Sequence, residues 1–208
     1  MGCSGSRDQT KENSQTRVIA IVGGPGCGKG TQCQRIRDNH KLVHISTGDL
    51  LREKKKTNPE FAKEMDSGKL VSSDIVVNLV KEVFAKDPKA IYLLDGFPRN
   101  QENLDVWTKI LGNSAKIEFM LFLQTSDEVM MQRMARRAAE SEQKRADDTD
   151  DEIQKNRIQV FRNETIPIVE SFKKDSKCHV INGNGDLESV TTEINAALKE
   201  RKVGNHAA

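Results

Sequence analysis

A glycine-rich stretch at residues 23–31 constrains this chain more than any other part of the sequence. It reads Gly-Gly-Pro-Gly-Cys-Gly-Lys-Gly-Thr and follows an apolar run, Val18–Val22, that predicts a buried parallel strand. A segment without helix breakers, residues 32–38, comes directly after it and predicts a helix. Glycines let the backbone turn tightly enough to aim several N–H groups inward, and the helix N-terminus adds partial positive charge. The sequence therefore predicts a phosphate-binding loop rather than an ordinary glycine-rich turn, with a nucleoside triphosphate as its ligand.

The expected ligand contacts of this loop come from its backbone and from one basic side chain. Lys29 stands where phosphate-binding loops carry the lysine that reaches the outer phosphates. The general pattern places Ser or Thr directly after that lysine, whereas here Gly30 intervenes and Thr31 comes second. We expect ATP to contact the loop at Gly24, Pro25, Gly26, Cys27, Gly28, Lys29, Gly30 and Thr31.

The composition predicts one α/β core with room for small inserted segments. The chain has 208 residues, of which 36% are apolar and 31% charged, and a net charge of +2. This charge predicts no strong attraction to nucleic acid, and no run of about 18 apolar residues predicts a membrane span. The cysteines form no Cys-x-x-Cys pair, which argues against a zinc site or a disulfide framework and favours a reducing cytosol. These cysteines are Cys3, Cys27, Cys33 and Cys178.

Residues 1–16 form a polar N-terminal tail that we expect to be disordered. The first six residues fit Met-Gly-x-x-x-Ser, so Gly2 is a candidate for myristoylation after removal of Met1. Cys3 beside it is a candidate for palmitoylation, and two acyl chains together give stable membrane anchoring. The alternative is a polar tail that matches the pattern by chance. We predict a cytoplasmic protein that contacts a membrane through this tail.

Four more apolar runs after Val18–Val22 predict the remaining strands of the core. Helical segments separate all five runs, so the fold class is α/β, with a five-stranded parallel sheet and helices on both faces. His44 takes an alternating position in the second strand and is expected to pack at the edge rather than to bind a ligand. Pro167 predicts a kink near Glu164, and residues 203–208 are expected to fray. The four further strands are expected at 42–45, 90–94, 116–123 and 178–181.

An acidic residue ends the third predicted strand. Asp95 follows the apolar run 90–94 and precedes Gly-Phe-Pro-Arg. The carboxyl end of a strand beside a phosphate-binding loop is where Mg²⁺ is held in such proteins, so Asp95 is predicted to bind Mg²⁺ through water. The alternative role for Asp95 is a turn cap, because Gly96 and Pro98 also favour a turn.

Two ordered signatures resemble those of the nucleoside monophosphate kinases, the family of adenylate and UMP/CMP kinases. The first is the loop variant Gly-x-Pro-Gly-x-Gly-Lys-Gly-Thr, and the second is Asp-Gly-Phe-Pro-Arg at 95–99. The resemblance covers residues 17–202 and implies reversible transfer of the γ-phosphoryl group of MgATP to a nucleoside monophosphate. It implies that Mg²⁺ bridges the donor phosphates near Thr31 and Asp95.

The family resemblance also assigns the acceptor side. The string Ser-Thr-Gly-Asp-Leu-Leu-Arg at 46–52 resembles the start of a monophosphate-binding segment that we place at 46–77. The resemblance implies that Arg52 and Arg99 grip the acceptor phosphate, with Gly96 beside them. The backbone at Val71 resembles the part that contacts the base, and Gly185 belongs to a segment that touches the donor adenine.

The lid is predicted at residues 137–147, short and without the cysteine cluster of long zinc-bearing lids. By resemblance, Arg137, Arg145 and Arg157 clasp the transferring phosphoryl group. This chain departs from the family pattern with Ala138 where Gly is usual and with extra residues before Arg145. The alternative for Arg137 is a solvated charge at the end of a basic helix.

Two markers of the acceptor base disagree. Adenylate kinases generally carry Gln four positions after Arg99, whereas this chain has Asn103 in a run that resembles UMP/CMP kinases. A carboxamide offers both a donor and an acceptor, so Asn100 and Asn103 suit uracil or cytosine. Thr47, in contrast, is typical of adenylate kinases. The longer match favours UMP and CMP, with dCMP as a further acceptor and AMP as the alternative.

The alternative from another class is a membrane-tethered nucleotide-binding scaffold with little turnover, which only the altered lid spacing supports. We expect the protein to be a monomer whose partners are small-molecule nucleotides and not nucleic acid.

Overall fold

The computed structural model describes residues 15–57, 69–140 and 150–203. Its strands are β1 (Thr16–Gly23), β2 (Val43–Ser46), β3 (Ile91–Asp95), β4 (Ala115–Gln124) and β5 (Cys178–Asn182). The helices of the first half are α1 (Lys29–His40), α2 (Thr47–Thr57), α4 (Ser73–Phe84), α5 (Gln101–Ile110) and η2 (Gly112–Ser114). Those of the second half are α6 (Asp127–Glu140), α7 (Asp151–Val160), the π-helical segment η4 (Phe161–Thr165), α8 (Ile166–Lys174) and α9 (Leu187–Glu200).

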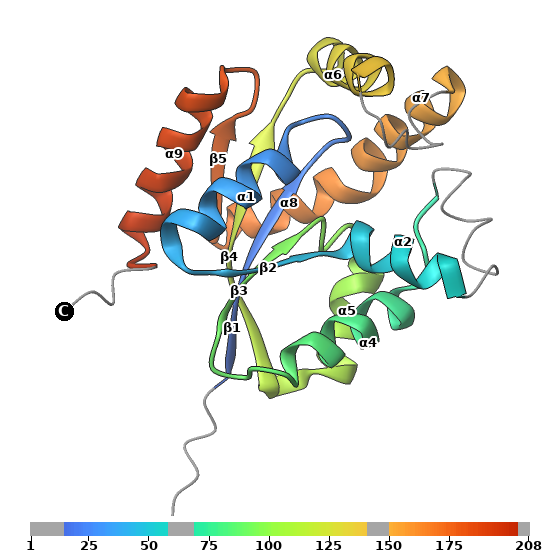
Figure 1. The fold of residues 1–208 in the computed structure, drawn as a ribbon. Helices are drawn as coiled ribbons and strands as arrows, with labels where there is room; N and C mark the ends of the chain where they lie inside the picture. Colours follow the sequence, from blue (N-terminus) through green and yellow to red (C-terminus); the bar gives the residue numbers. More distant parts are fainter. Residues whose placement is uncertain (1–14, 58–68, 141–149, 204–208) are drawn as a thin grey trace, which may run out of the picture.

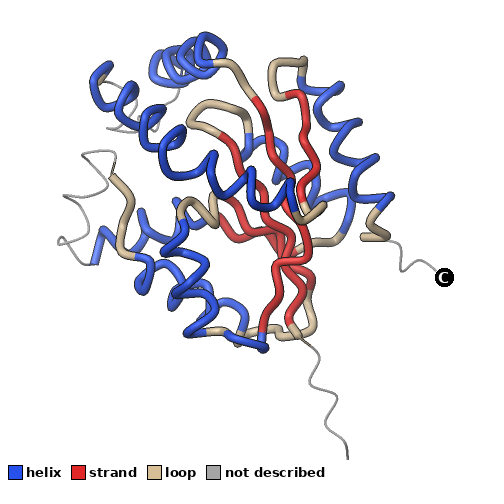
Figure 2. The backbone as a smooth tube through the Cα atoms, turned by 180° about the vertical axis from the view of Figure 1, so that it is seen from behind, coloured by secondary structure: helices blue, strands red, loops and turns tan. Residues whose placement is uncertain are grey.

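The five strands form one parallel sheet in the order β2-β3-β1-β4-β5. Helices cover both faces of this sheet, as Figure 1 and Figure 2 show. β1 is the switch point of the sheet: the chain adds β3 on one side of β1 and then β4 on the other. In open α/β sheets, ligands bind beyond the carboxyl ends of the strands at such a switch point. The predicted fold class and its five strands are confirmed.

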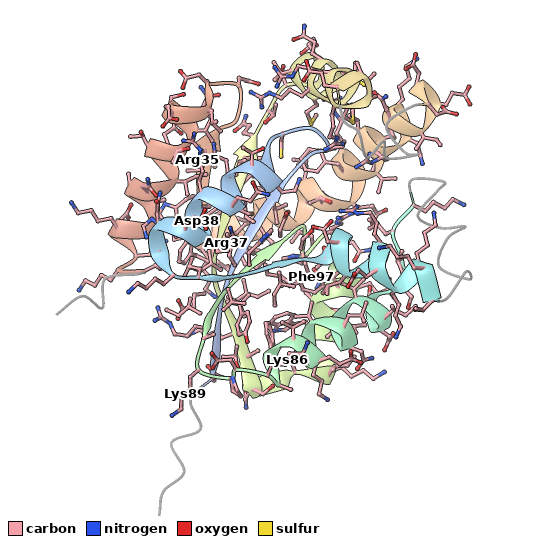
Figure 3. The ribbon with its side chains drawn as sticks, in the orientation of Figure 1. Arg35, Arg37, Asp38, Lys86, Lys89 and Phe97 are labelled. Carbon is pink, nitrogen blue, oxygen red and sulfur yellow. The ribbon has the colours of Figure 1, made fainter. Side chains whose placement is uncertain are left out.

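Alternation along the strands divides the core into two layers. Ile19, Ile21 and Leu93 face α1 and α9, whereas Val18, Ala20 and Leu94 face the helices on the other side. Residues of α4 and α5 pack in the second layer, which includes Phe97, labelled in Figure 3. Its ring centroid lies 5.4 Å from that of Trp107. A period of two residues is expected for strands that are covered on both faces.

Local chemistry explains two element boundaries, and one of them confirms a prediction. The hydroxyl of Ser46 caps the start of α2 by accepting a hydrogen bond from the Asp49 N–H at 3.2 Å. The π-helical segment η4 lies where Pro167 predicted a kink, because a proline lacks the N–H that a regular helix needs. None of the described helices is both long enough and apolar enough to span a bilayer.

Some boundaries differ from the prediction. Thr16, which we assigned to the disordered N-terminal tail, is the first residue of β1 and is only 5% exposed, because it is paired in the sheet. Val203 does not fray: its side chain is 1% exposed, and its N–H donates to the Leu198 carbonyl at 2.9 Å. An apolar side chain just beyond a helix end gains more from burial against the core than the chain loses in entropy. Residues 204–208, the N-terminal tail with Gly2 and Cys3, and most of the lid with Arg145 lie outside the described residues.

Candidate nucleotide-binding site

The phosphate-binding loop connects β1 to α1 at the switch point of the sheet. Gly26 and Gly28 have φ angles of +76° and +98°, in the left-handed region that glycine adopts without strain. Helix α1 begins at Lys29, earlier than predicted, so its first free N–H groups border the loop. The Lys29 ammonium donates to the carbonyls of Gly23 at 2.7 Å and Gly24 at 3.1 Å. The loop therefore presents backbone donors and one cation at the same place, as anion binding requires.

Helix α6 packs closely over this loop. A Cβ atom at Gly24 would lie 2.2 Å from the Met130 sulfur, and one at Gly26 would lie 2.5 Å from the Met130 carbonyl oxygen. Gly26 is therefore required both by this packing against the backbone of α6 and by its left-handed conformation, whereas a side chain at Gly24 would displace the Met130 side chain.

Arg133, one helical turn after Met130, ties the loop to the end of the sheet. Its guanidinium donates to the carbonyls of Gly183 at 2.7 Å, Gly185 at 3.2 Å and Cys27 at 3.3 Å. This residue was not among the predicted site residues. The signal in the sequence was its position four residues before Arg137, which places both side chains on one face of α6.

Two cavities open at this end of the molecule. The larger one is bordered by the loop residues Pro25–Thr31 and by acidic and basic side chains. The other is lined in part by apolar residues of α2, η4 and the segment before α4, among them Leu51, Val71 and Phe161. Both cavities are bordered by Pro25, Lys29, Gly48, Arg52, Arg99 and Arg157. Four cationic side chains thus stand between a space beside the loop and a space with apolar walls.

Asp95 is the last residue of β3 and borders the larger cavity together with Thr31. A carboxylate and a hydroxyl are the oxygen ligands that Mg²⁺ prefers, directly or through water. The two predicted magnesium ligands therefore border the same cavity, and this donor set fits the ion.

The acceptor-side residues surround the second cavity. Arg52 is paired with Asp49, and the Arg99 Nε donates to the Gly96 carbonyl at 2.7 Å. The buried Thr47 donates its hydroxyl to the Asp95 carbonyl at 2.9 Å. Thr47 is thereby fixed under the turn at Gly96, where it supports the turn that carries Arg99.

Asn103 has a different place from the one predicted. Its side chain is 4% exposed, its Nδ2 donates to the Ser73 hydroxyl at 2.8 Å, and its Oδ1 accepts from the Arg99 N–H at 2.9 Å. Asn100 caps α5 by accepting from the Asn103 N–H. Neither asparagine is among the lining residues of the two cavities. Because both polar atoms of the Asn103 carboxamide are used within the protein, the direct reading of the base that we predicted does not match this conformation.

The structure places most of the remaining predicted residues near the phosphate-binding loop, and one of them lies outside the described residues. Arg137 and Arg157 border the larger cavity, so the structure brings them to the phosphate-binding loop despite the altered lid spacing. Gly185 adjoins the loop through its bond to Arg133. Arg136, which was not predicted, borders the same cavity. The contribution of Arg145 stays a prediction, because it lies outside the described residues.

Comparison with known proteins agrees with this geometry. Residues 21–177 match the family model described as adenylate kinase. The chain is 37% identical to a UMP-CMP kinase of Danio rerio over 194 residues, which cover 88% of this chain and 97% of that protein. It is 35% identical to the UMP-CMP kinase of Homo sapiens, with 85% and 94% covered. It is also 35% identical to an adenylate kinase of Prochlorococcus marinus, with 86% and 97% covered.

Together, the sheet order, the phosphate-binding loop and the cationic wall define a P-loop phosphotransferase. The cationic wall is the set of four basic side chains that borders both cavities: Lys29, Arg52, Arg99 and Arg157. Given the extent of the match, the chain belongs to the adenylate kinase family. The family predicted from the two sequence signatures is thereby confirmed.

Proposed function

We propose that this protein is a UMP/CMP kinase, which transfers the γ-phosphoryl group of MgATP reversibly to UMP or CMP, with dCMP as a further acceptor. The observation that carries this proposal is the set of cationic side chains that borders both cavities: Lys29, Arg52, Arg99 and Arg157. A donor with its phosphates at the loop and an acceptor with its phosphate at Arg52 and Arg99 would meet at this cationic wall. The relatives named UMP-CMP kinase support the choice of acceptor.

The transfer follows from the position of these groups. An oxygen of the acceptor phosphate attacks the γ-phosphorus, and the bond from that phosphorus to the β-phosphate oxygen of ATP breaks, which leaves ADP. Such a reaction needs alignment and neutralisation of charge more than covalent catalysis. The loop N–H groups and Lys29 hold the donor phosphates, and Arg52 and Arg99 orient the acceptor. Arg137 and Arg157 balance the charge on the moving group, together with Arg145 of the predicted lid at 137–147.

Mg²⁺, when bound at Thr31 and Asp95, supplies positive charge that neutralises the donor phosphates. The lid excludes water when it covers the reacting groups, and water would otherwise take the phosphoryl group.

For the acceptor base, we propose an indirect role for Asn103. Its Oδ1 holds the backbone N–H of Arg99, so this side chain positions the arginine that grips the acceptor phosphate. The backbone around Val71, which borders the second cavity among its apolar lining residues, is the proposed contact for the base.

The second candidate is an adenylate kinase, which Thr47 and the relative from Prochlorococcus marinus favour. The test is diphosphate formation from MgATP with UMP, CMP, dCMP and AMP offered separately. We expect kcat/KM to be highest for UMP and CMP. Preference for AMP would establish the second candidate, and no turnover with any acceptor would favour the tethered scaffold.

We also propose that the protein is cytoplasmic and attached to a membrane through acyl groups on Gly2 and Cys3. The test is incorporation of an alkyne-labelled myristate in cells. Label in the natural chain but not in Gly2→Ala supports attachment, whereas an unlabelled natural chain contradicts it.

A further inference from the structure

Three potential metal ligands from three different elements meet beside the larger cavity. Cys33 comes from α1, His44 from β2 and Asp95 from β3, and one ligand atom of each lies within 4.8 Å of the other two. Cys33 is completely buried, and the side chains of His44 and Asp95 are 17% and 11% exposed. His44 and Asp95 also border the cavity, which gives an ion from solvent a route to the cluster.

The sheet register explains why these side chains share one face. Ser46 of β2 stands opposite Asp95 of β3, and His44 stands opposite Leu93. His44 and Asp95 are therefore diagonal neighbours, two residues apart in register and on the same side of the sheet. Leu93 packs with Cys33 in the layer under α1, so α1 lays the thiol over this pair. The rigid pairing of β2 with β3 fixes the separation of the two ligands on the sheet.

His44 carries a polar atom that the fold leaves unsatisfied. Its Nε2 is buried and has no hydrogen-bond partner among the residues that the structure describes. The nearest acidic atom is the Asp95 Oδ2 at 3.5 Å, in a geometry that is not a hydrogen bond. Buried polar atoms of side chains nearly always have a partner, so an exception requires an explanation.

The separation of these two atoms matches the edge of a metal tetrahedron. An ion with ligands at about 2.0–2.1 Å places two neighbouring ligands about 3.3 Å apart. The observed 3.5 Å between Nε2 and Oδ2 is close to that distance. A thiolate, an imidazole and a carboxylate together form a set that suits Zn²⁺ and similar thiophilic ions better than Mg²⁺.

We propose that Cys33, His44 and Asp95 form a binding site for Zn²⁺, with water as the fourth ligand, and that the bound ion inhibits the protein. The Cys33 thiol gives up its proton to solvent when the Zn–S bond forms, so one proton is released for each ion bound. Inhibition follows because Asp95 cannot serve Zn²⁺ and the nucleotide-bound Mg²⁺ at once. This second part rests on the proposed kinase function, whereas binding of the ion does not.

Spacing along the chain gave no sign of this site. The three residues are not neighbours in the sequence, and the cysteines were judged by the absence of Cys-x-x-Cys pairs. The ligands come together only through strand register and helix packing.

The binding test uses the full chain without nucleotide. Zn²⁺ is titrated in competition with a chromophoric chelator, and Co²⁺ serves as a spectroscopic probe because a thiolate ligand gives it a charge-transfer band. We expect one ion per chain, with a Co²⁺ spectrum of a thiolate-ligated, four-coordinate ion. Cys33→Ser and His44→Gln should each weaken Zn²⁺ binding by roughly tenfold or more. Circular dichroism of both variants establishes that they are folded.

Cys3→Ser and Cys178→Ser are the matched controls, since they remove thiols elsewhere, and both should bind Zn²⁺ like the natural chain. No uptake by the natural chain would overturn the proposal. Uptake that is unchanged in both Cys33→Ser and His44→Gln would also overturn it, because the ion would then be bound elsewhere.

The activity test follows on the same samples. Pre-incubation with one equivalent of Zn²⁺ should slow phosphoryl transfer, a chelator should restore it, and His44→Gln should resist the inhibition. If zinc binds through these residues but the zinc-free protein transfers no phosphoryl group, the site stands and the proposed function fails. If the protein is an active kinase but takes up no zinc, the proposed function stands and the zinc site fails.

Discussion

Replacing Asn103 by leucine tests whether this residue positions Arg99 or reads the base. Leucine keeps the branched shape of asparagine but removes both polar atoms. The variant loses the bond from Nδ2 to the Ser73 hydroxyl and the bond from the Arg99 N–H to Oδ1. Leaving one buried polar group unpaired costs about 1–3 kcal/mol. Water can reach the half-buried Arg99 backbone more easily than Ser73, so we expect a total loss of about 2–4 kcal/mol in the free energy of unfolding.

Urea denaturation of Asn103→Leu, Ser73→Ala and the double variant measures this loss. The two residues are in contact, so the double variant should lose less stability than the sum of the single variants. Steady-state kinetics supply the second readout. If Asn103 acts through Arg99, the KM for UMP, CMP and AMP should rise by the same factor, because all acceptors carry the same phosphate. A loss of stability below about 0.5 kcal/mol, the range of ordinary surface changes, would refute the structural reasoning. A reversal of the preference between UMP and AMP would show that Asn103 reads the base directly.

Three further predictions concern two residues of the phosphate-binding loop and His179 in β5. Lys29→Ala should abolish measurable turnover, with circular dichroism to establish that the variant is folded, because the substitution also removes bonds to the Gly23 and Gly24 carbonyls. Full activity in a coupled assay would exclude the proposed site. Gly26→Ala should destabilise the fold by at least about 1–2 kcal/mol, the cost of a left-handed backbone, since its Cβ also meets the Met130 carbonyl. Gly30→Ala is the matched stability control in urea denaturation, because a Cβ there meets open space beyond its own turn of α1. Burial, and then the charge of Arg201, lower the pKa of His179 below its ordinary 6.5, so its contribution to stability is present above pH 6.5 and is lost as the pH falls through the folded-state pKa. His179→Gln should therefore lose less stability than the natural chain between neutral and acidic pH, and equal slopes in denaturation against pH would contradict this.

Local sequence patterns were sufficient wherever the chemistry lies within a few consecutive residues. The glycine-rich loop, the strand before it and Lys29 could be predicted because turn geometry and phosphate binding depend on adjacent backbone groups. The order of strands and helices followed from apolar periodicity for the same reason. Arg52, Arg99 and Arg157 were identified by resemblance, and their common position between two cavities agrees with it.

The sequence by itself thus determined the loop, the fold class and the family signatures. Only the tertiary structure decided that the Asn103 carboxamide forms its hydrogen bonds with Ser73 and Arg99. The tertiary structure likewise decided that Arg133 links α6 to the loop and that Val203 is buried. It also decided that a thiol, an imidazole and a carboxylate from three elements share one face of the sheet. Each of these contacts joins residues whose distance is set by strand register and helix packing. Those quantities depend on the whole core, so no short segment of sequence contains them.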